Sequence, residues 1–324
     1  MRANNGPFGP LRRLERWIFR PGDPRRLAAA RIGLCLLLAA RLSRPMYLQL
    51  AGQPRALFRP ISFMHLLPAM PVQGVALAVQ IIAVAACVLG AAGAFTRLSV
   101  PVAWLGALFL NGMWTSVGQP MHNDTLPLLA MVPLLFAPTA DAWSVDAMRR
   151  PRPSSAPSCR YGWPLRTAML MVAGAYFFSG FNKLLLSGPA WFLSGNLRWI
   201  LFASSDTSPH PVKLALFLAG HPLAAQGVAA MTLLIELGFP LTLWKPMTAW
   251  FFVPAVGLLH LGIWFTMHLD YSAWILTVIV LFVPWDAVAD REGILARIWL
   301  SPIGFRDAAA AAGTQQGSLL SGEQ

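Results

Sequence analysis

Long apolar stretches, separated by short polar or proline-rich segments, recur along most of the chain. A transmembrane helix needs about 20 mostly apolar residues to cross the hydrocarbon core of a bilayer, and several stretches reach or approach that length. The pattern predicts an all-α fold, a polytopic transmembrane helical bundle of about eight spans. The expected spans cover residues 27–42, 72–95, 98–117, 124–136, 165–186, 227–243, 249–267 and 271–283.

Two segments do not fit this pattern of spans. Residues 47–68 mix proline, arginine and aromatic side chains at no clear period, which indicates an interfacial or re-entrant stretch. Between residues 187 and 226 no stretch is both long and apolar, although 191–202 and 212–218 are apolar enough to lie in the interface or to enter and return. We therefore expect interfacial or re-entrant helices in addition to the spans.

The composition supports a membrane protein. The 324 residues are 56% hydrophobic and 12% charged, with a mean hydropathy of +0.56, whereas soluble domains usually carry about 25% charged residues. We expect one transmembrane domain over residues 27–286. It is flanked by a basic cytoplasmic segment, residues 1–26, and by a largely disordered cytoplasmic tail, residues 287–324.

The net charge of +12 comes from 25 lysines and arginines against 13 acidic residues. These basic residues lie outside the apolar stretches instead of gathering on one folded surface, which argues against nucleic-acid binding. With eight spans the basic head, Arg97, the loop at 149–160, Lys245 and Arg291 fall on one side, and the positive-inside rule makes that side cytoplasmic. The prediction is a multi-pass protein of the cell inner membrane with both termini in the cytoplasm and the lipid bilayer as its partner.

Three cysteines, Cys35, Cys87 and Cys159, have no paired spacing, so neither a disulfide framework nor a zinc site is predicted. His122 and Asp124 supply only two potential ligands, too few for a metal site. We expect no metal centre.

Several polar residues fall within or beside the predicted spans, where an ionisable group is costly and therefore a functional candidate. Lys183 lies near the end of the fifth span, after the small residues Ser179 and Gly180, which permit close helix approach. In an apolar pocket its charged form would be disfavoured and the neutral amine could act as a base; alternatively, it reaches out to the headgroups. His260 and Glu236 are mid-span and are expected to pair, either in a shared polar cavity or as a purely structural bond.

Other polar residues are expected on the same, extracytoplasmic side. His122, Asn123 and Asp124 lie at the mouth of the fourth span and are candidates for substrate binding, although Asp124 could instead cap that helix. Asn182 and Trp191 are the further candidates, close in sequence to Lys183.

Four blocks, in order along residues 17–286, resemble one known family, the vitamin K-dependent γ-carboxylase-like proteins, also called the horizontally transferred transmembrane (HTTM) domain family. The blocks are Arg20-Pro21-Gly22-Asp23-Pro24 with Arg31; Ala142-Trp143-Ser144-Val145-Asp146; residues 175–184 with Trp191 and Gly195; and Glu236 through His260.

The resemblance implies a catalytic base at Lys183 and a reduced quinone, similar to vitamin K, as cofactor. In the carboxylase a neutral lysine deprotonates the hydroquinone, and oxygen adds to it. The strong base so formed removes a γ-proton from a protein glutamate, and carbon dioxide traps the resulting carbanion. This chain departs from the family at Asn182, where the family has a second lysine, and it has no large segment after the last span.

The leading hypothesis is therefore a membrane enzyme that acts from the extracytoplasmic side on a quinol or on an exported peptide or protein. In it Lys183 is the base, His260 and Glu236 are its partners, and Asp124 has an orienting role. One alternative is a non-catalytic membrane partner for peptide export, maturation or immunity. A transporter is a third, which the lack of evident internal repeats disfavours.

Overall fold

The computed structural model describes residues 9–118, 122–149, 156–206 and 212–285. Over these ranges every regular element is a helix, and the only bridge between extended residues joins Gly22 to Ser158. The expected all-α helical bundle is confirmed. The tail at 287–324, which includes Arg291, lies outside the described residues, and so does part of the basic loop at 149–160.

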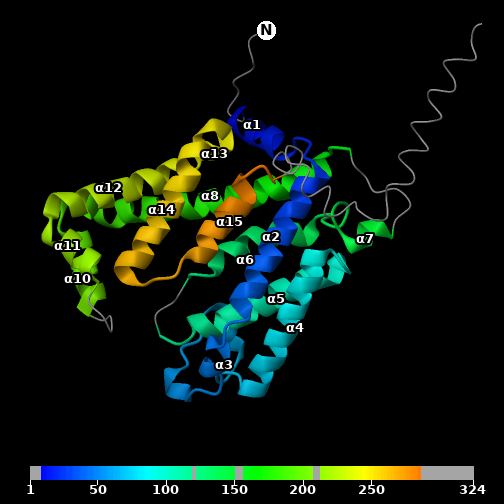
Figure 1. Ribbon diagram of the computed structural model, residues 1–324, viewed down its shortest axis with the longest axis horizontal. Helices are drawn as coiled ribbons and strands as arrows, with labels where there is room; N and C mark the ends of the chain where they lie inside the picture. Colours follow the sequence, from blue (N-terminus) through cyan, green and yellow to red (C-terminus); the bar gives the residue numbers. More distant parts are fainter. Residues whose placement is uncertain (1–8, 119–121, 150–155, 207–211, 286–324) are drawn as a thin grey trace, which may run out of the picture. The chain divides into compact units, whose positions relative to one another are not determined.

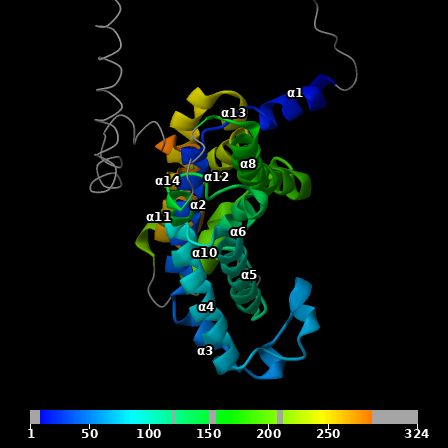
Figure 2. The ribbon, with the colours of Figure 1, turned by 90° about the vertical axis from the view of Figure 1, so that its right-hand side faces the viewer.

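The first half of the chain builds a helical layer around α4, which packs against both α2 and α5 (Figure 1). The same three helices lie side by side with the view turned (Figure 2). The elements of this half are α1 (Gly9–Ile18), α2 (Pro24–Leu42), α3 (Met46–Leu50), η1 (Arg55–Leu57), η2 (Ser62–Leu66), α4 (Gln73–Ala92) and α5 (Thr96–Thr115).

In the second half, α8 packs against α12, and α15 packs against both α14 and α2, so that it joins the two halves. The elements here are α6 (Thr125–Met131), η3 (Val132–Phe136), α7 (Val145–Met148), α8 (Cys159–Ser187), α9 (Ala190–Leu193), α10 (Asn196–Asp206), α11 (Lys213–Gly220), α12 (Pro222–Gly238), α13 (Leu241–Trp244), η4 (Pro246–Thr248), α14 (Ala249–Met267) and α15 (Ser272–Phe282).

In the part of the chain that the structure describes, five helical stretches are long and apolar enough to cross a membrane, which indicates a membrane protein. They are Gln73–Ala92, Thr96–Thr115, Cys159–Ser187, Pro222–Trp244 and Ala249–Met267. The packing of α4 fits lipid surroundings. Small residues such as Ala83 and Gly90 face its neighbours, whereas Ile81 and Ile82 are more than half exposed. Helices in membranes associate through such small residues, and their large apolar side chains face lipid.

The other three expected spans are also helical but differ from these five. α2 has 19 residues, enough for a span, but includes four arginines. Thr125–Phe136 and Ser272–Phe282 are apolar but short. At about 1.5 Å per residue they measure roughly 17–18 Å, against a hydrocarbon core of about 30 Å. The number of about eight spans therefore stays a prediction.

Several boundaries differ from those expected. α8 begins at Cys159, six residues before the expected start, because the side chain of Ser158 caps it by accepting from the backbone N–H of Arg160. α12 begins at Pro222, five residues early, because proline is favoured in the first turn of a helix. Between Ser187 and Pro222 the described residues, which leave out 207–211, form only the short helices α9, α10 and α11, and no long span was expected there.

The buried guanidinium of Arg31 explains how α2 carries a charge among apolar residues. The side chain is fully buried and donates to the backbone oxygens of Thr139, Ala142 (3.4 Å) and Trp143 (2.5 Å). These carbonyls lie between η3 and α7, so Arg31 holds that loop against α2. The charge faces protein and not lipid.

The turn between α4 and α5 rests on Gly93 and Asp146. Asp146 of α7 accepts hydrogen bonds from the backbone N–H groups of Phe95 and Thr96, both at 2.9 Å, where α5 begins. Gly93 ends α4 with φ of 71°, and a Cβ added there would lie 2.2 Å from the Cβ of Ser144. Only glycine gives both the left-handed backbone and the close approach of α7.

We expect Gly93→Ala to destabilise the protein by clearly more than the ~1 kcal/mol of a left-handed alanine, because the new methyl group also collides with Ser144. Gly52→Ala is the matched control, since Gly52 has the same φ of 71° but nothing within 4 Å of an added Cβ. Thermal unfolding in detergent micelles measures both. Equal losses of stability would show that the collision with Ser144 is relieved by relaxation.

Candidate functional site

A lysine–glutamate ion pair joins α8 to α12 within the bundle. The Nζ atom of Lys183 lies 2.5 Å from Oε1 and 2.6 Å from Oε2 of Glu236. Ser179 accepts from Lys183 at 3.0 Å and donates to Glu236 at 3.2 Å. The side chain of Lys183 is 22% exposed and that of Glu236 is 9% exposed. The lysine therefore contacts the carboxylate of Glu236, one of the two partners that the leading hypothesis gave it.

The spacing of residues on α8 positions this pair. Ser179, Gly180 and Lys183 follow Tyr176 by three, four and seven residues, so the four residues share one face of the helix. A Cβ added at Gly180 would lie 3.0 Å from the Cβ of Glu236. The small residue thus lets α12 approach closely enough for the carboxylate to reach both Ser179 and Lys183, as the sequence predicted.

His260 of α14 does not pair with Glu236, so that prediction is wrong. Its Nε2 atom lies 2.9 Å from the hydroxyl of Tyr176. Tyr176 is about two helical turns from Lys183 along α8, and Glu236 already has Lys183 and Ser179 as partners. Nδ1 of His260 is buried and has no hydrogen-bond partner among the described residues.

Aromatic rings connect His260 to the loop that carries His122. The ring of His260 is stacked on that of Tyr271, with the centroids 5.2 Å apart, and Trp274 packs against both. The hydroxyl of Tyr271 lies 2.9 Å from Nε2 of His122, whose backbone oxygen accepts from Trp274 at 3.1 Å. His122 itself is exposed.

Asp124 does not cap α6, so that alternative is also wrong. Its side chain makes no capping hydrogen bond and forms an ion pair with Arg41, near the end of α2. The side chains of Asp124 and Arg41 are 6% and 4% exposed. Without this pair the carboxylate would be buried without a counter-charge, so the arginine determines where Asp124 points.

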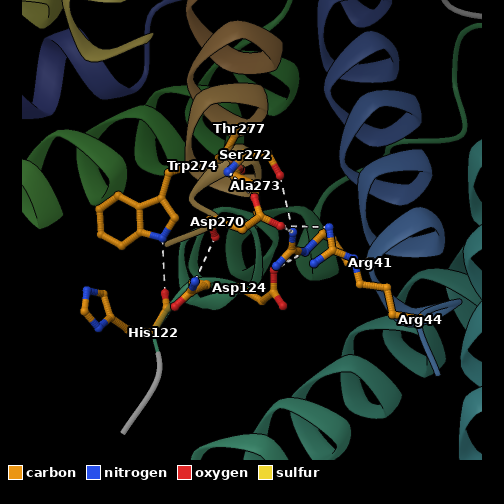
Figure 3. A network of polar contacts seen from close by, with 10 residues as sticks. Arg41, Arg44, His122, Asp124, Asp270, Ser272, Ala273, Trp274 and Thr277 are labelled. Atoms are coloured by element: carbon orange, nitrogen blue, oxygen red, sulfur yellow. Dashed lines mark hydrogen bonds and ion pairs between the residues drawn. The ribbon is translucent and has the colours of Figure 1, made fainter. Parts of the chain in front are cut away.

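Figure 3 shows that Arg41 connects three segments of the chain. Besides Asp124 it contacts Oδ2 of Asp270 at 2.6 Å, and Arg44 reaches the same atom at 2.9 Å. Asn123 donates to the backbone oxygen of Asp270 at 2.8 Å. The network fixes the 122–124 loop against the start of α15 and so sets the contact between His122 and Tyr271. We name Arg41, Arg44, Asp124 and Asp270 the arginine–aspartate network.

Sequence reasoning missed this network. Asp270 had the pattern of an ordinary interface residue, and Arg41 lies at the end of an apolar run where it could equally reach the headgroups. The available signal was the second arginine, after Arg31, inside a predicted span. Such a residue needs an acidic partner or a set of carbonyl groups.

Of the two remaining candidates, Trp191 lies beside the ion pair and Asn182 does not. The ring centroid of Trp191 is 5.5 Å from Nζ of Lys183, and its Nε1 atom is buried with no hydrogen-bond partner among the residues that the structure describes. Asn182 is exposed on another side of α8, away from the ion pair. Within the described ranges no three His, Cys, Asp or Glu side chains gather as a metal site would require.

No protein-family model, no curated protein and no solved structure matches the chain. The fold and the site define a polytopic helical membrane protein with an ion pair and a histidine–tyrosine pair on one face of α8.

We expect Arg41→Ala to lower the free energy of unfolding by about 3–5 kcal/mol, because it leaves the buried carboxylate of Asp124 without a counter-charge. Arg44→Ala should cost no more than about 1 kcal/mol, since the side chain of Arg44 is 39% exposed and its ion pair is with the partly exposed Asp270. Chemical denaturation in mixed micelles compares the two. Equal losses of unfolding free energy in the two variants would contradict the role of Arg41 as the buried counter-charge of Asp124.

The network also predicts a pH dependence through Asp270. Burial by itself raises the pKa of this carboxyl group, but hydrogen bonds from Ser272 and Arg41 and the charge of Arg41 outweigh burial and hold the pKa far below its ordinary value. A carboxyl group with a lowered pKa stabilises the folded state above the unfolded-state pKa of about 4, and this contribution disappears as the pH falls through the folded-state value.

Asp270→Asn should therefore lower the melting temperature at neutral pH, and the difference from wild type should narrow as the pH falls below about 4. Glu15→Gln, which removes an exposed carboxylate, is the control and should show no such narrowing. A constant difference for Asp270→Asn across the whole range would contradict the predicted role of its charge.

Proposed function

We propose that the chain is a membrane enzyme of the vitamin K-dependent γ-carboxylase-like family, and that Lys183 and Glu236 remove a proton from a lipophilic substrate. The observation that carries the proposal is the ion pair itself, with Nζ and Oε1 2.5 Å apart between two apolar helices. Ionisable groups inside transmembrane helices are costly and commonly mark functional sites.

A purely structural role accounts poorly for this pair. Desolvating two charges costs about as much as their attraction returns, so well-packed apolar residues would join α8 and α12 at least as well. The pair also has a second polar neighbour on the same helix face, the Tyr176–His260 pair, and the exposed fraction of Lys183 leaves it accessible. These features support chemistry at the pair.

The short contact lets the pair act as a base. Moving one proton from Nζ of Lys183 to the carboxylate of Glu236 turns ammonium and carboxylate into amine and carboxylic acid. The amine lone pair can then accept a proton from an acidic hydroxyl. Ser179 remains within hydrogen-bonding distance of both groups and keeps them aligned.

A quinol fits the groups around the pair. A bound quinol would supply acidic hydroxyl groups and two electrons for the reduction of oxygen. The ring of Trp191 offers an aromatic surface beside Lys183, and its unpartnered Nε1–H can donate to a ring oxygen. An exported peptide or protein is the other substrate class that the resemblance implies.

The contacts at the two ends of the helices support the proposed topology in the inner membrane, with both termini cytoplasmic. The arginine–aspartate network unites the end of α2, the start of α6 and the start of α15. The pair Gly22–Ser158 joins the starts of α2 and α8, and the hydrogen bond from Thr96 to Asp146 joins the α4–α5 turn to α7. In the predicted topology these two groups lie on the extracytoplasmic and cytoplasmic sides.

Activity of purified protein in nanodiscs tests the proposal, with oxidation of a reduced naphthoquinone by dissolved oxygen as the readout. Lys183→Ala and Glu236→Gln should each lower the rate by at least about a hundredfold. Lys183→Arg should be equally inactive, because a guanidinium keeps its proton. Lys213→Ala removes an exposed lysine and is the control.

All variants should match wild type in abundance and monodispersity. Full activity of Lys183→Arg would contradict a lysine base. If wild type itself oxidises no quinol and every variant supports normal maturation of an exported peptide, the results would instead support a non-catalytic membrane partner.

A further inference from the structure

The helix α1 is amphipathic and basic. Leu11, Leu14, Trp17 and Ile18 fall within one arc of the helix at 100° per residue, and Arg12, Arg13 and Arg16 occupy the opposite arc. The three arginines are exposed. Such a helix, short and with arginines opposite large apolar side chains, is typical of segments that lie in the plane of a membrane surface.

The apolar arc of α1 is only partly covered by protein. Trp17 packs against the core of the bundle, but Leu11 is 63% exposed. Phe19, which lies directly after the helix and outside this arc, is 54% exposed. Figure 2 shows α1 leaving the bundle beside α8, with its first residues away from the other labelled helices. The described part of the protein therefore leaves the side chains of Leu11 and Phe19 largely uncovered.

Contacts at the other end of α1 fix its position beside the first turns of α8. The guanidinium of Arg166 in α8 donates to the backbone oxygens of Ile18 (3.2 Å), Arg20 and Pro21 (3.1 Å). A cation at these carbonyls satisfies the C-terminal end of the helix. The backbone bridge between Gly22 and Ser158 then leads directly into α2, while Ser158 caps α8.

The charge at this end of the bundle is complementary to an anionic surface. Arginines outnumber acidic residues there. Two of the acids are each paired with one arginine, Asp23 with Arg25 and Asp141 with Arg160, and α1 itself contains one acid, Glu15. Further arginines of this rim are Arg12, Arg13, Arg16, Arg20, Arg26 and Arg166.

From these observations we propose that α1 lies on the bilayer surface and binds the headgroups of anionic phospholipids through Arg12, Arg13 and Arg16, with Leu11 and Phe19 inserted among the acyl chains. The charge complementarity, together with the exposed apolar side chains of Leu11 and Phe19 beside the arginines, identifies the occupant as an anionic bilayer. The proposal is independent of the chemistry at Lys183. A basic residue at an anionic surface strengthens attachment about fivefold, so the three arginines together contribute roughly a hundredfold.

Hydrogen–deuterium exchange of the full-length protein in nanodiscs tests this. Nanodiscs of phosphatidylcholine are compared with nanodiscs that also contain phosphatidylglycerol. We expect the amides of residues 9–18 to exchange more slowly in the anionic discs, by up to roughly a hundredfold, and added salt should reduce this difference. In the variant Arg12→Gln/Arg13→Gln/Arg16→Gln the two lipids should give the same exchange.

Two comparisons keep the result specific. Arg55→Gln/Arg59→Gln removes exposed arginines near the opposite end of α2 and should keep the lipid-dependent protection of α1. Leu11→Ser should weaken protection in both lipids, since it removes the inserted side chain. Unchanged exchange in α8 shows that each variant is folded.

Equal protection of α1 in both lipids would overturn the proposal. So would full protection in phosphatidylcholine discs on addition of inorganic phosphate, because the site would then recognise a free anion and not a bilayer. Lipid-dependent protection that survives in the triple arginine variant would also overturn it.

Discussion

The high free-energy cost of a charge without a partner among apolar helices shapes this protein. Arg31 is stabilised by backbone carbonyls, Arg41 by two aspartates, and Lys183 by Glu236. Each solution ties together segments that are far apart in the sequence. The folded arrangement of the helix ends therefore depends on a few polar contacts, while the apolar surface between them is adaptable.

The apolar packing depends on the size of the side chains and not on charge. Small residues such as Ala83 and Gly180 lie where helices meet, and large residues such as Ile81 and Leu185 face outward. Because lipid chains are as apolar as these side chains, close packing of small residues brings the helices together. The close approach at Gly180 then places a carboxylate next to Lys183, so that the same geometry that packs α8 on α12 also creates the candidate site.

The sequence predicted the helices well, because each depends on a local run of apolar residues. All eight expected spans are helical, and the errors are confined to ends, where Ser158 and Pro222 extend helices by local capping chemistry. Partners within the site could not be predicted in the same way. His260 was assigned to Glu236 because both are mid-span, but rotation of α8 and α14 brings Tyr176 to the histidine instead. Depth in the membrane follows from the sequence, whereas the direction that a side chain faces follows from tertiary packing.

Two of the helices have a consequence for the surrounding lipid. α15 and the α6–η3 segment contact each other, and at 11 and 12 residues both are too short to match a bilayer of ordinary thickness. If the two segments cross the bilayer, as in the predicted topology, hydrophobic mismatch of this size would force the lipid to thin beside them or let water enter above them. Solvent protons could then approach His122 and Tyr271 without crossing the full hydrocarbon barrier.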